Sequence, residues 1–175
     1  MSPEPASRHL TPDDVVLRES TPDDTLVLDT FSSREVRSEH DYYDDDDLGD
    51  GHRGASRSGS RVISDAASAV LGRVTFHQVA YGPNRRSLAW RIGVTVLPEH
   101  RGRGVGARAQ RILADELFAT TDAWRVEADT EVDNVAERRA LLAAGFREEG
   151  VLRGARWRAG ARRDAVMFSR TRNDA

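Results

Sequence analysis

The sequence has no cysteine, no lysine, few aromatic residues (6%) and no long apolar run. The absence of cysteine excludes disulfide bonds, thiolate zinc sites and a cysteine nucleophile. A helix that spans a bilayer needs about 18 successive apolar residues, and no segment comes near that length. The N-terminal residues also lack the basic and then apolar pattern of a signal peptide. We therefore expect a soluble, cytoplasmic protein that makes no membrane contact.

Charged residues make up 31% of the chain, and the formal net charge is -3. An acidic run at 41–50 stands against an arginine-rich C-terminal third that includes the segment 153–163. Domains that bind nucleic acid usually carry a net positive charge, so no nucleic-acid partner is predicted. The five histidines lack the spacing of metal ligands, and the acidic run lacks the closing glutamate of a calcium loop. We expect no metal.

A chain of 175 residues fits one domain with a sizeable core. Its composition predicts a flexible polar tail at 1–9 and a domain at 10–172. Within this domain, the segment at about 32–60 is rich in charge, serine and glycine, which predicts a loop insert.

Apolar periodicity and turn-forming residues predict the secondary structure of the remaining chain. The stretch "TPDD" at 21–24 has a capping threonine, an early proline and two aspartates, which favour the start of a helix. Gly145 is placed to end a later helix in a left-handed conformation. Trp90, Trp124 and Trp157 are expected in the core. The expected order is a strand (13–20), a helix from 21, about three strands (61–98), a helix (104–120), a strand (123–130), a helix (133–146) and a hairpin (150–170).

The stretch "RGRGVG" at 101–106 separates an apolar strand from an amphipathic helix. Glycines allow the backbone N–H groups of such a turn to converge on an anion, and a helix N-terminus adds favourable potential. Arg101 and Arg103 add full positive charges. The turn therefore predicts a phosphate or pyrophosphate site, and the alternative is a solvent-exposed connection without a ligand.

Two familiar glycine motifs do not fit this turn. Gly102, Gly104 and Ala107 match the dinucleotide pattern G-x-G-x-x-A, but residues 98–101 intervene between the strand and the first glycine. The chain beyond the turn also lacks the strand and helix alternation of a doubly wound sheet. A nucleoside triphosphatase loop is excluded because no Gly-Lys-Ser/Thr follows.

The segment "VLPEHRGRGVGARAQ" is similar to the acyl-coenzyme A motif of the GNAT-type N-acetyltransferase superfamily, Arg/Gln-x-x-Gly-x-Gly/Ala, through Arg101, Gly104 and Gly106. The segment 133–170 resembles the RimJ/RimL-like branch, whose type is a ribosomal-protein alanine N-acetyltransferase. Shared features are a helix that begins with asparagine, Gly-Phe, Glu-Gly and a final hairpin. The resemblance covers roughly 70–170 and 15–31.

This resemblance implies a single-domain α/β (α+β) fold with a mixed central sheet of about seven strands, splayed in the middle and flanked by helices. It implies an acetyl-CoA-dependent N-acetyltransferase that moves an acetyl group directly to a primary amine, either a protein N-terminus or a small cationic amine. A homodimer is possible on this basis. The acetyl donor is expected in the V-shaped opening of the sheet. Residues implied to hold the coenzyme are Arg101, Gly102, Arg103, Gly104, Val105, Gly106 and Asn134.

Amide formation sets two further requirements. An aliphatic amine has a pKa near ~10.4 and an α-amine near ~8, so the acceptor must lose a proton to a general base. Negative charge that develops on the thioester oxygen needs a backbone N–H donor. The resemblance places that donor, and the backbone that pairs with the pantetheine arm, at Val94, Thr95 and Val96.

Glu127, Asp129 and Glu131 alternate along one strand and should share a face, so they are candidates for the base. The alternative is that they are solvated or salt-bridged carboxylates. Asn134 is either a helix cap or a coenzyme contact. The acidic run borders the acceptor side in this fold, where it would either attract a cationic acceptor or form a solvated loop.

Several residues depart from the family pattern. Many relatives have a glutamate where this chain has Arg91, a tyrosine where it has Leu141 and a serine where it has Glu137. A second interpretation is therefore a catalytically degenerate acyl-CoA-binding sensor or partner module.

Overall fold

The computed structural model describes residues 14–31, 33, 36 and 57–174. The predicted tail (1–9), the acidic run (41–50) and most of the predicted insert lie outside the described residues. The strands and helices are β1 (Val16–Arg18), α1 (Thr25–Thr30), β2 (Ser58–Ser64), β3 (Val70–Ala80), β4 (Leu88–Val96), α2 (Val105–Thr120), β5 (Arg125–Glu131), α3 (Val135–Ala143), β6 (Arg147–Arg158) and β7 (Ala161–Thr171). This order matches the predicted one.

The strand β2 begins earlier than its composition predicts. Ser58 and Gly59 were assigned to the loop insert, yet they pair with His77 and Phe76 of β3. Serine and glycine are poor strand formers, so pairing with β3 decides the structure here.

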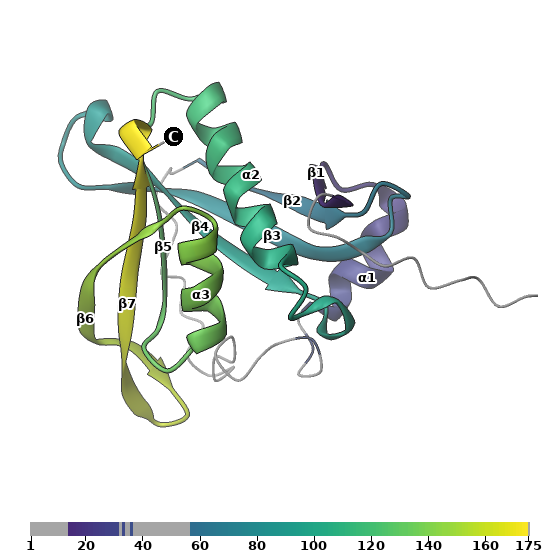
Figure 1. Cartoon of the computed structure of the whole chain (residues 1–175). Coiled ribbons are helices and arrows are strands. Elements are labelled where there is room, and N and C mark those ends of the chain that lie inside the picture. The colour runs from purple at the N-terminus through teal and green to yellow at the C-terminus, as the bar shows by residue number, and fades with distance from the viewer. Residues whose placement is uncertain (1–13, 32, 34–35, 37–56, 175) are drawn as a thin grey trace, which may run out of the picture.

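The strands form one mixed seven-stranded sheet in the order β1-β2-β3-β4-β5-β7-β6. Neighbouring strands are antiparallel except β4 and β5, which run parallel. The helices α2 and α3 lie side by side on one face of this sheet (Figure 1). The predicted fold class is confirmed.

The sheet opens between its two central parallel strands. β3 and β4 stay paired from Gly72↔Val96 to Ala80↔Leu88. In contrast, β4 pairs with β5 only at Trp90↔Val126 and Arg91↔Glu127. The two strands therefore separate beyond Arg91, which is the splay that the resemblance implies.

Gly145, with φ +91°, follows α3, and its N–H donates to the Leu142 carbonyl at 3.0 Å, as expected for a C-terminal cap.

The main core lies between α2 and the sheet. The core contains Val105, Ala109, Leu113 and Leu117 of α2, which recur at helical spacing, together with Trp90 of β4, and Ile112 of α2 packs against it while partly buried.

The expectation of core positions for the other two tryptophans is wrong. Trp124 is 52% exposed just before β5, and Trp157 is 44% exposed on β6, the last strand of the sheet. An edge strand has no neighbour to cover it on one side, so a large side chain there stays accessible. The Trp157 ring instead lies 5.6 Å from the Arg162 guanidinium carbon.

An ion pair fixes the turn before α1. Arg18 donates to the two carboxylate oxygens of Asp24 at 2.7 and 2.8 Å, and the Thr21 backbone N–H adds a third bond at 2.7 Å. The Arg18 hydrogen bonds, followed by that of Thr21, hold the pKa of Asp24 well below its usual range.

This lowered pKa predicts a dependence of stability on pH. A carboxyl group with a lowered folded-state pKa stabilises the fold above its unfolded value, near ~3.9, and that contribution is lost as the pH falls toward the folded value. Asp24→Asn should therefore lower the thermal midpoint at pH 7, and the gap to the wild type should close in acid. Thermal unfolding from pH 7 to pH 2 measures this gap. Asp23→Asn, at an exposed neighbouring position, should melt within about a degree of the wild type at every pH. An equal effect of the two substitutions would contradict the role of the Arg18–Asp24 ion pair.

In the described part of the chain, no helix has both the length and the hydropathy that a membrane span requires.

Candidate functional site

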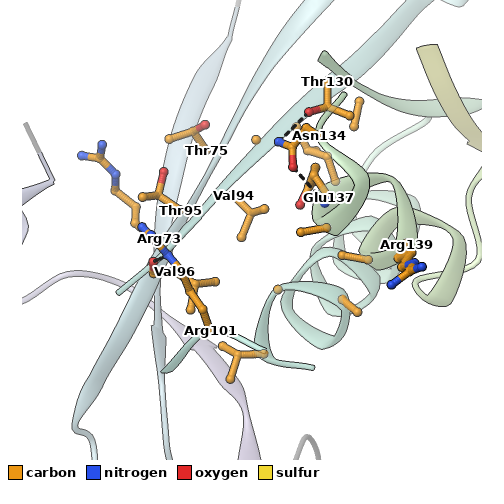
Figure 2. A pocket seen from close by; sticks show the side chains of 18 of the residues that line it. Arg73, Thr75, Val94, Thr95, Val96, Arg101, Thr130, Asn134, Glu137 and Arg139 are labelled. Carbon is orange, nitrogen blue, oxygen red and sulfur yellow. Dashed lines mark hydrogen bonds between the residues drawn. The ribbon is translucent and has the colours of Figure 1, made fainter. Parts of the chain in front are cut away.

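A cleft of about 860 Å³ occupies the space where β4 and β5 separate. Its walls come from β3, β4, β5, α3, the glycine turn (101–106) and the start of α2. One further residue, Arg156, comes from β6. Figure 2 shows Val94, Thr95 and Val96 on one side of the opening and Asn134 and Thr130 on the other. The cleft thus connects the helical face of the sheet with the opposite face.

The glycine turn forms one end of this cleft. Gly102 and Gly104 have φ of +70° and +79°, a left-handed conformation that other residues rarely adopt. They let the chain turn sharply before α2 begins at Val105. The N–H groups of the first helical turn have no partner within the helix, so they are available to an anion in the cleft.

Gly106 keeps this end of the cleft open. It lies in the first turn of α2 and lines the cleft, and an added Cβ would sit 3.6 Å from Val96 Cγ2. That space is an ordinary contact for one carbon but would be filled by a larger side chain. The backbone donors and the free space fit a pyrophosphate group.

The two arginines of the turn are placed differently. Arg101 lines the cleft, but its Nε donates to the Val96 carbonyl at 2.9 Å and its Nη2 donates to the Val36 carbonyl. Its guanidinium therefore ties the turn to the end of β4. Arg103 is exposed and is absent from the cleft lining.

The edge of β4 offers backbone groups to the cleft. The Leu97 N–H, just after β4, donates to the carbonyl of Leu71 in β3 at 2.9 Å. Because N–H directions alternate along an antiparallel pair, those of Val94 and Val96 point away from β3 and toward the cleft. The Val96 carbonyl agrees with this, since it accepts the bond from Arg101. Val94 and Val96 are two of the three residues for which the resemblance implies backbone contacts, whereas by the same alternation the Thr95 N–H points toward β3.

Asn134 is the N-cap of α3 and also lines the cleft. Its Oδ1 accepts from the Glu137 N–H at 3.2 Å, and its Nδ2 donates to Thr130 Oγ1 at 3.0 Å (Figure 2). The cap is confirmed, and a contact with the coenzyme stays a prediction.

Glu127 is fully buried and bound by several donors. It accepts hydrogen bonds from Tyr81 Oη at 2.6 Å, Arg91 Nη2 at 2.6 Å and Arg125 Nε at 2.7 Å. Arg125 also donates to both oxygens of Glu149 at 2.6 Å. Burial and then the hydrogen bond to Glu127 raise the pKa of Tyr81. The hydrogen bond from Arg125 lowers the pKa of Glu149. Glu127 is thus the centre of an ion-pair network.

The other two candidate carboxylates are also paired with arginine. Asp129 accepts from Arg156 Nη2 at 2.8 Å, and Glu131, 1% exposed, is bound by Arg158. The three carboxylates share a face as predicted, but only Asp129 lines the cleft. Their role as base stays a prediction.

The strand β3 contributes cleft residues that the sequence pattern did not predict. Arg73, Thr75 and His77 all line the cleft, and so does His100 beside the glycine turn. The alternating polar residues of β3 were a signal for one solvent-facing side, but nothing in the pattern indicated that this side borders the site. Leu141, at the position of the family tyrosine, is fully buried in the core.

Residues 14–147 match the model of the Acetyltransferase (GNAT) domain. The chain belongs to this family. The match agrees with the resemblance carried by the glycine turn, and the open sheet with its cleft is the architecture that the resemblance implied. In the part of this GNAT domain that the structure describes, no group of three or more His, Asp or Glu residues could hold a metal ion.

Several known proteins are similar to this GNAT domain. The uncharacterized N-acetyltransferase YoaA of Bacillus subtilis is 30% identical over 100 residues, which are 57% of this chain and 54% of that protein. The chain spans about half the length of the curated relatives that it matches.

Solved structures show the same fold. Spermidine N-acetyltransferase from Vibrio cholerae, solved with CoA and spermine, has a TM-score of 0.72 at 19% identity, over 93% of this chain and 98% of that chain. RimJ of Mycobacterium smegmatis, solved with CoA-disulfide, has a TM-score of 0.69 at 23% identity, over 91% and 83% of the two chains.

Proposed function

We propose that this chain is an acetyl-CoA-dependent N-acetyltransferase that transfers an acetyl group directly to a primary amine. The observation that carries the proposal is the cleft between β4 and β5, which has a glycine turn at one end and an unpaired strand edge along one wall. This combination suits a ligand with an anionic head and an extended amide arm. CoA has both features.

The residues of the cleft divide into two functions. The N–H groups around Gly104 and Gly106 bind the pyrophosphate, and the edge of β4 from Val94 to Val96 pairs with the pantetheine arm. The Val94 N–H, close to the point of separation, stabilises the negative charge that develops on the thioester oxygen. Asn134 borders the opposite wall and holds that end of α3 in place.

The acceptor enters from the face of the sheet opposite α2 and α3. A protein N-terminus and a small cationic amine are the two candidate acceptors, and the structural neighbours include a spermidine N-acetyltransferase and a ribosomal-protein-S5-alanine acetyltransferase. The acidic run at 41–50 would favour a cationic amine if it borders this entrance.

A catalytically degenerate acyl-CoA-binding module is the second candidate. It is favoured by two observations, the burial of Leu141 and the engagement of Arg91 with Glu127. Both residues occupy positions where relatives carry acid or base groups.

One assay separates the two functions. Thiol release from acetyl-CoA should rise with one class among N-terminal Ser/Ala peptides, polyamines and aminoglycosides. The absence of cysteine removes protein background from the thiol reagent. Release with any acceptor would exclude the degenerate module. Absence of release with every acceptor, on a sample that binds acetyl-CoA, would exclude the transferase for these amines.

A further inference from the structure

A primary ammonium has no lone pair with which to attack, so the cleft needs a proton acceptor. In the described part of the chain, the titratable groups that line it are arginines, Asp129, Glu137, His77 and His100. Arginine keeps its proton at any physiological pH and cannot act as the base. The choice lies between two carboxylates and two histidines.

Position along the cleft separates these groups. His100 follows the end of β4 beside the glycine turn, and Glu137 lies in the first turn of α3, whose N-terminus faces the proposed coenzyme. Asp129 is closer to the point where the strands separate, but its Oδ2 already accepts bonds from Arg156 at 2.8 and 3.2 Å. His77 of β3 pairs with Arg91, which is the last residue of β4 that pairs with β5.

His77 belongs to the face from which we propose that the acceptor enters. Val74 and Phe76 of β3 pack against the core under α2, so His77, next in the alternation, points to the opposite face. Arg91 shares that face as its cross-strand partner. Since His77 also lines the cleft, its imidazole borders the opening from the acceptor side.

Gly93 leaves a passage beside this histidine. It pairs with Thr75, and a Cβ built on Gly93 would lie 3.1 Å from Thr75 Oγ1. The missing side chain leaves the acceptor face open two residues beyond the last β4–β5 pair. Diagonal neighbours on paired strands have side chains ~7–8 Å apart, so the His77 imidazole can reach the space above Gly93 directly or through one water.

We propose that His77 is the general base of the transfer, a step that rests on the proposed function. The acceptor ammonium gives one proton to the neutral imidazole. The nitrogen lone pair then forms the C–N bond to the thioester carbonyl carbon, and the C–S bond breaks with its electron pair on sulfur. The second nitrogen proton moves to that sulfur, which yields the amide and the free thiol of CoA. The imidazolium returns its proton to solvent.

The surroundings of His77 suit this exchange. A neutral imidazole has one unprotonated ring nitrogen, which can accept a proton. The charged groups that line the cleft on the same side are Arg73 of β3, Arg91 of β4, Asp129 of β5 and Arg156 of β6. Asp129 is the anion among them, and it can stabilise the imidazolium that forms during the step.

The test compares His77→Gln with the wild type and with His9→Gln, the same exchange in the N-terminal tail. With an acceptor that the wild type acetylates, His77→Gln should lower kcat roughly 100-fold and leave the Kd for acetyl-CoA unchanged. The wild-type pH profile should show an acid limb that disappears in the variant. His9→Gln should match the wild type in both respects.

A second variant protects the test from a merely structural effect. His77→Ala should regain activity when imidazole is added, and the wild type should not respond. Wild-type kinetics and an unchanged acid limb in His77→Gln would overturn the role of His77 while leaving the proposed function in place. A wild-type chain that binds acetyl-CoA without acetylating any acceptor would overturn the proposed function itself, and with it this inference.

Discussion

Replacing Gly106 with leucine is expected to weaken acetyl-CoA binding roughly 1000-fold, or ~4 kcal/mol, and to leave the chain folded. Gly106 lines the cleft, and an added Cβ would lie 3.6 Å from Val96 Cγ2, so the further atoms of a leucine side chain would extend into the cleft. The added side chain would occupy the volume that we assign to the pyrophosphate. Because leucine is about 1 kcal/mol better than glycine as a helix former, the thermal midpoint should not fall.

Isothermal calorimetry with acetyl-CoA, beside a thermal melt, measures both quantities. Ala119→Leu is the matched control, because it adds the same side chain to the same helix at an exposed position near its other end. Gly104 is a poorer choice, since its φ of +79° would add backbone strain to any substitution. Wild-type affinity in a folded Gly106→Leu protein would remove the coenzyme from this turn.

Glu127→Gln is expected to destabilise the protein by about 3 kcal/mol, because a buried charge network would lose its central anion. Arg91, Arg125 and Tyr81 all donate to Glu127, whose side chain is fully buried. For a chain of this size the thermal midpoint should drop by about 10 °C. Glu148→Gln removes a solvent-exposed partner of Arg138 and should cost less than about 1 kcal/mol.

The same variant tests one of the candidate bases. If Glu127 were the proton acceptor, its amide variant would lose turnover in a protein of nearly normal stability. If Glu127 is a structural anion, chemical denaturation should show a loss in the free energy of unfolding. The value of kcat should then fall only slightly, because Arg91 loses its partner at the wall of the cleft. A large loss of kcat together with an unchanged unfolding midpoint would contradict the structural role.

Local patterns in the sequence were sufficient for most of the fold. The glycine turn, the Asn134 cap and the helical spacing of α2 each depend on residues close together in the chain, and each agrees with the structure. Trp157 shows the limit of this reasoning. Its apolar character predicts burial, but its exposure follows from the position of β6 at the sheet edge, which no local pattern specifies.

The site was harder to predict because its members meet through strand pairing. The alternation of Glu127, Asp129 and Glu131 was sufficient to place them on one face, but apart from Arg125 of β5 their arginine partners come from other strands. Arg91 lies on β4, and Arg156 on β6, which reaches Asp129 across β7. His77 was missed for the same reason, since the register of β3 on β4 places it beside the opening.

The short pairing between β4 and β5 gives the bound ligand a structural role in the sheet. Elsewhere each central strand is held by a neighbour along its length, whereas beyond Arg91 one edge of β4 has no strand beside it among the residues that the structure describes. An extended pantetheine arm would complete that edge and serve as a temporary strand. Each turnover would then dismantle and rebuild a piece of secondary structure, with the departing product taking part of the sheet with it.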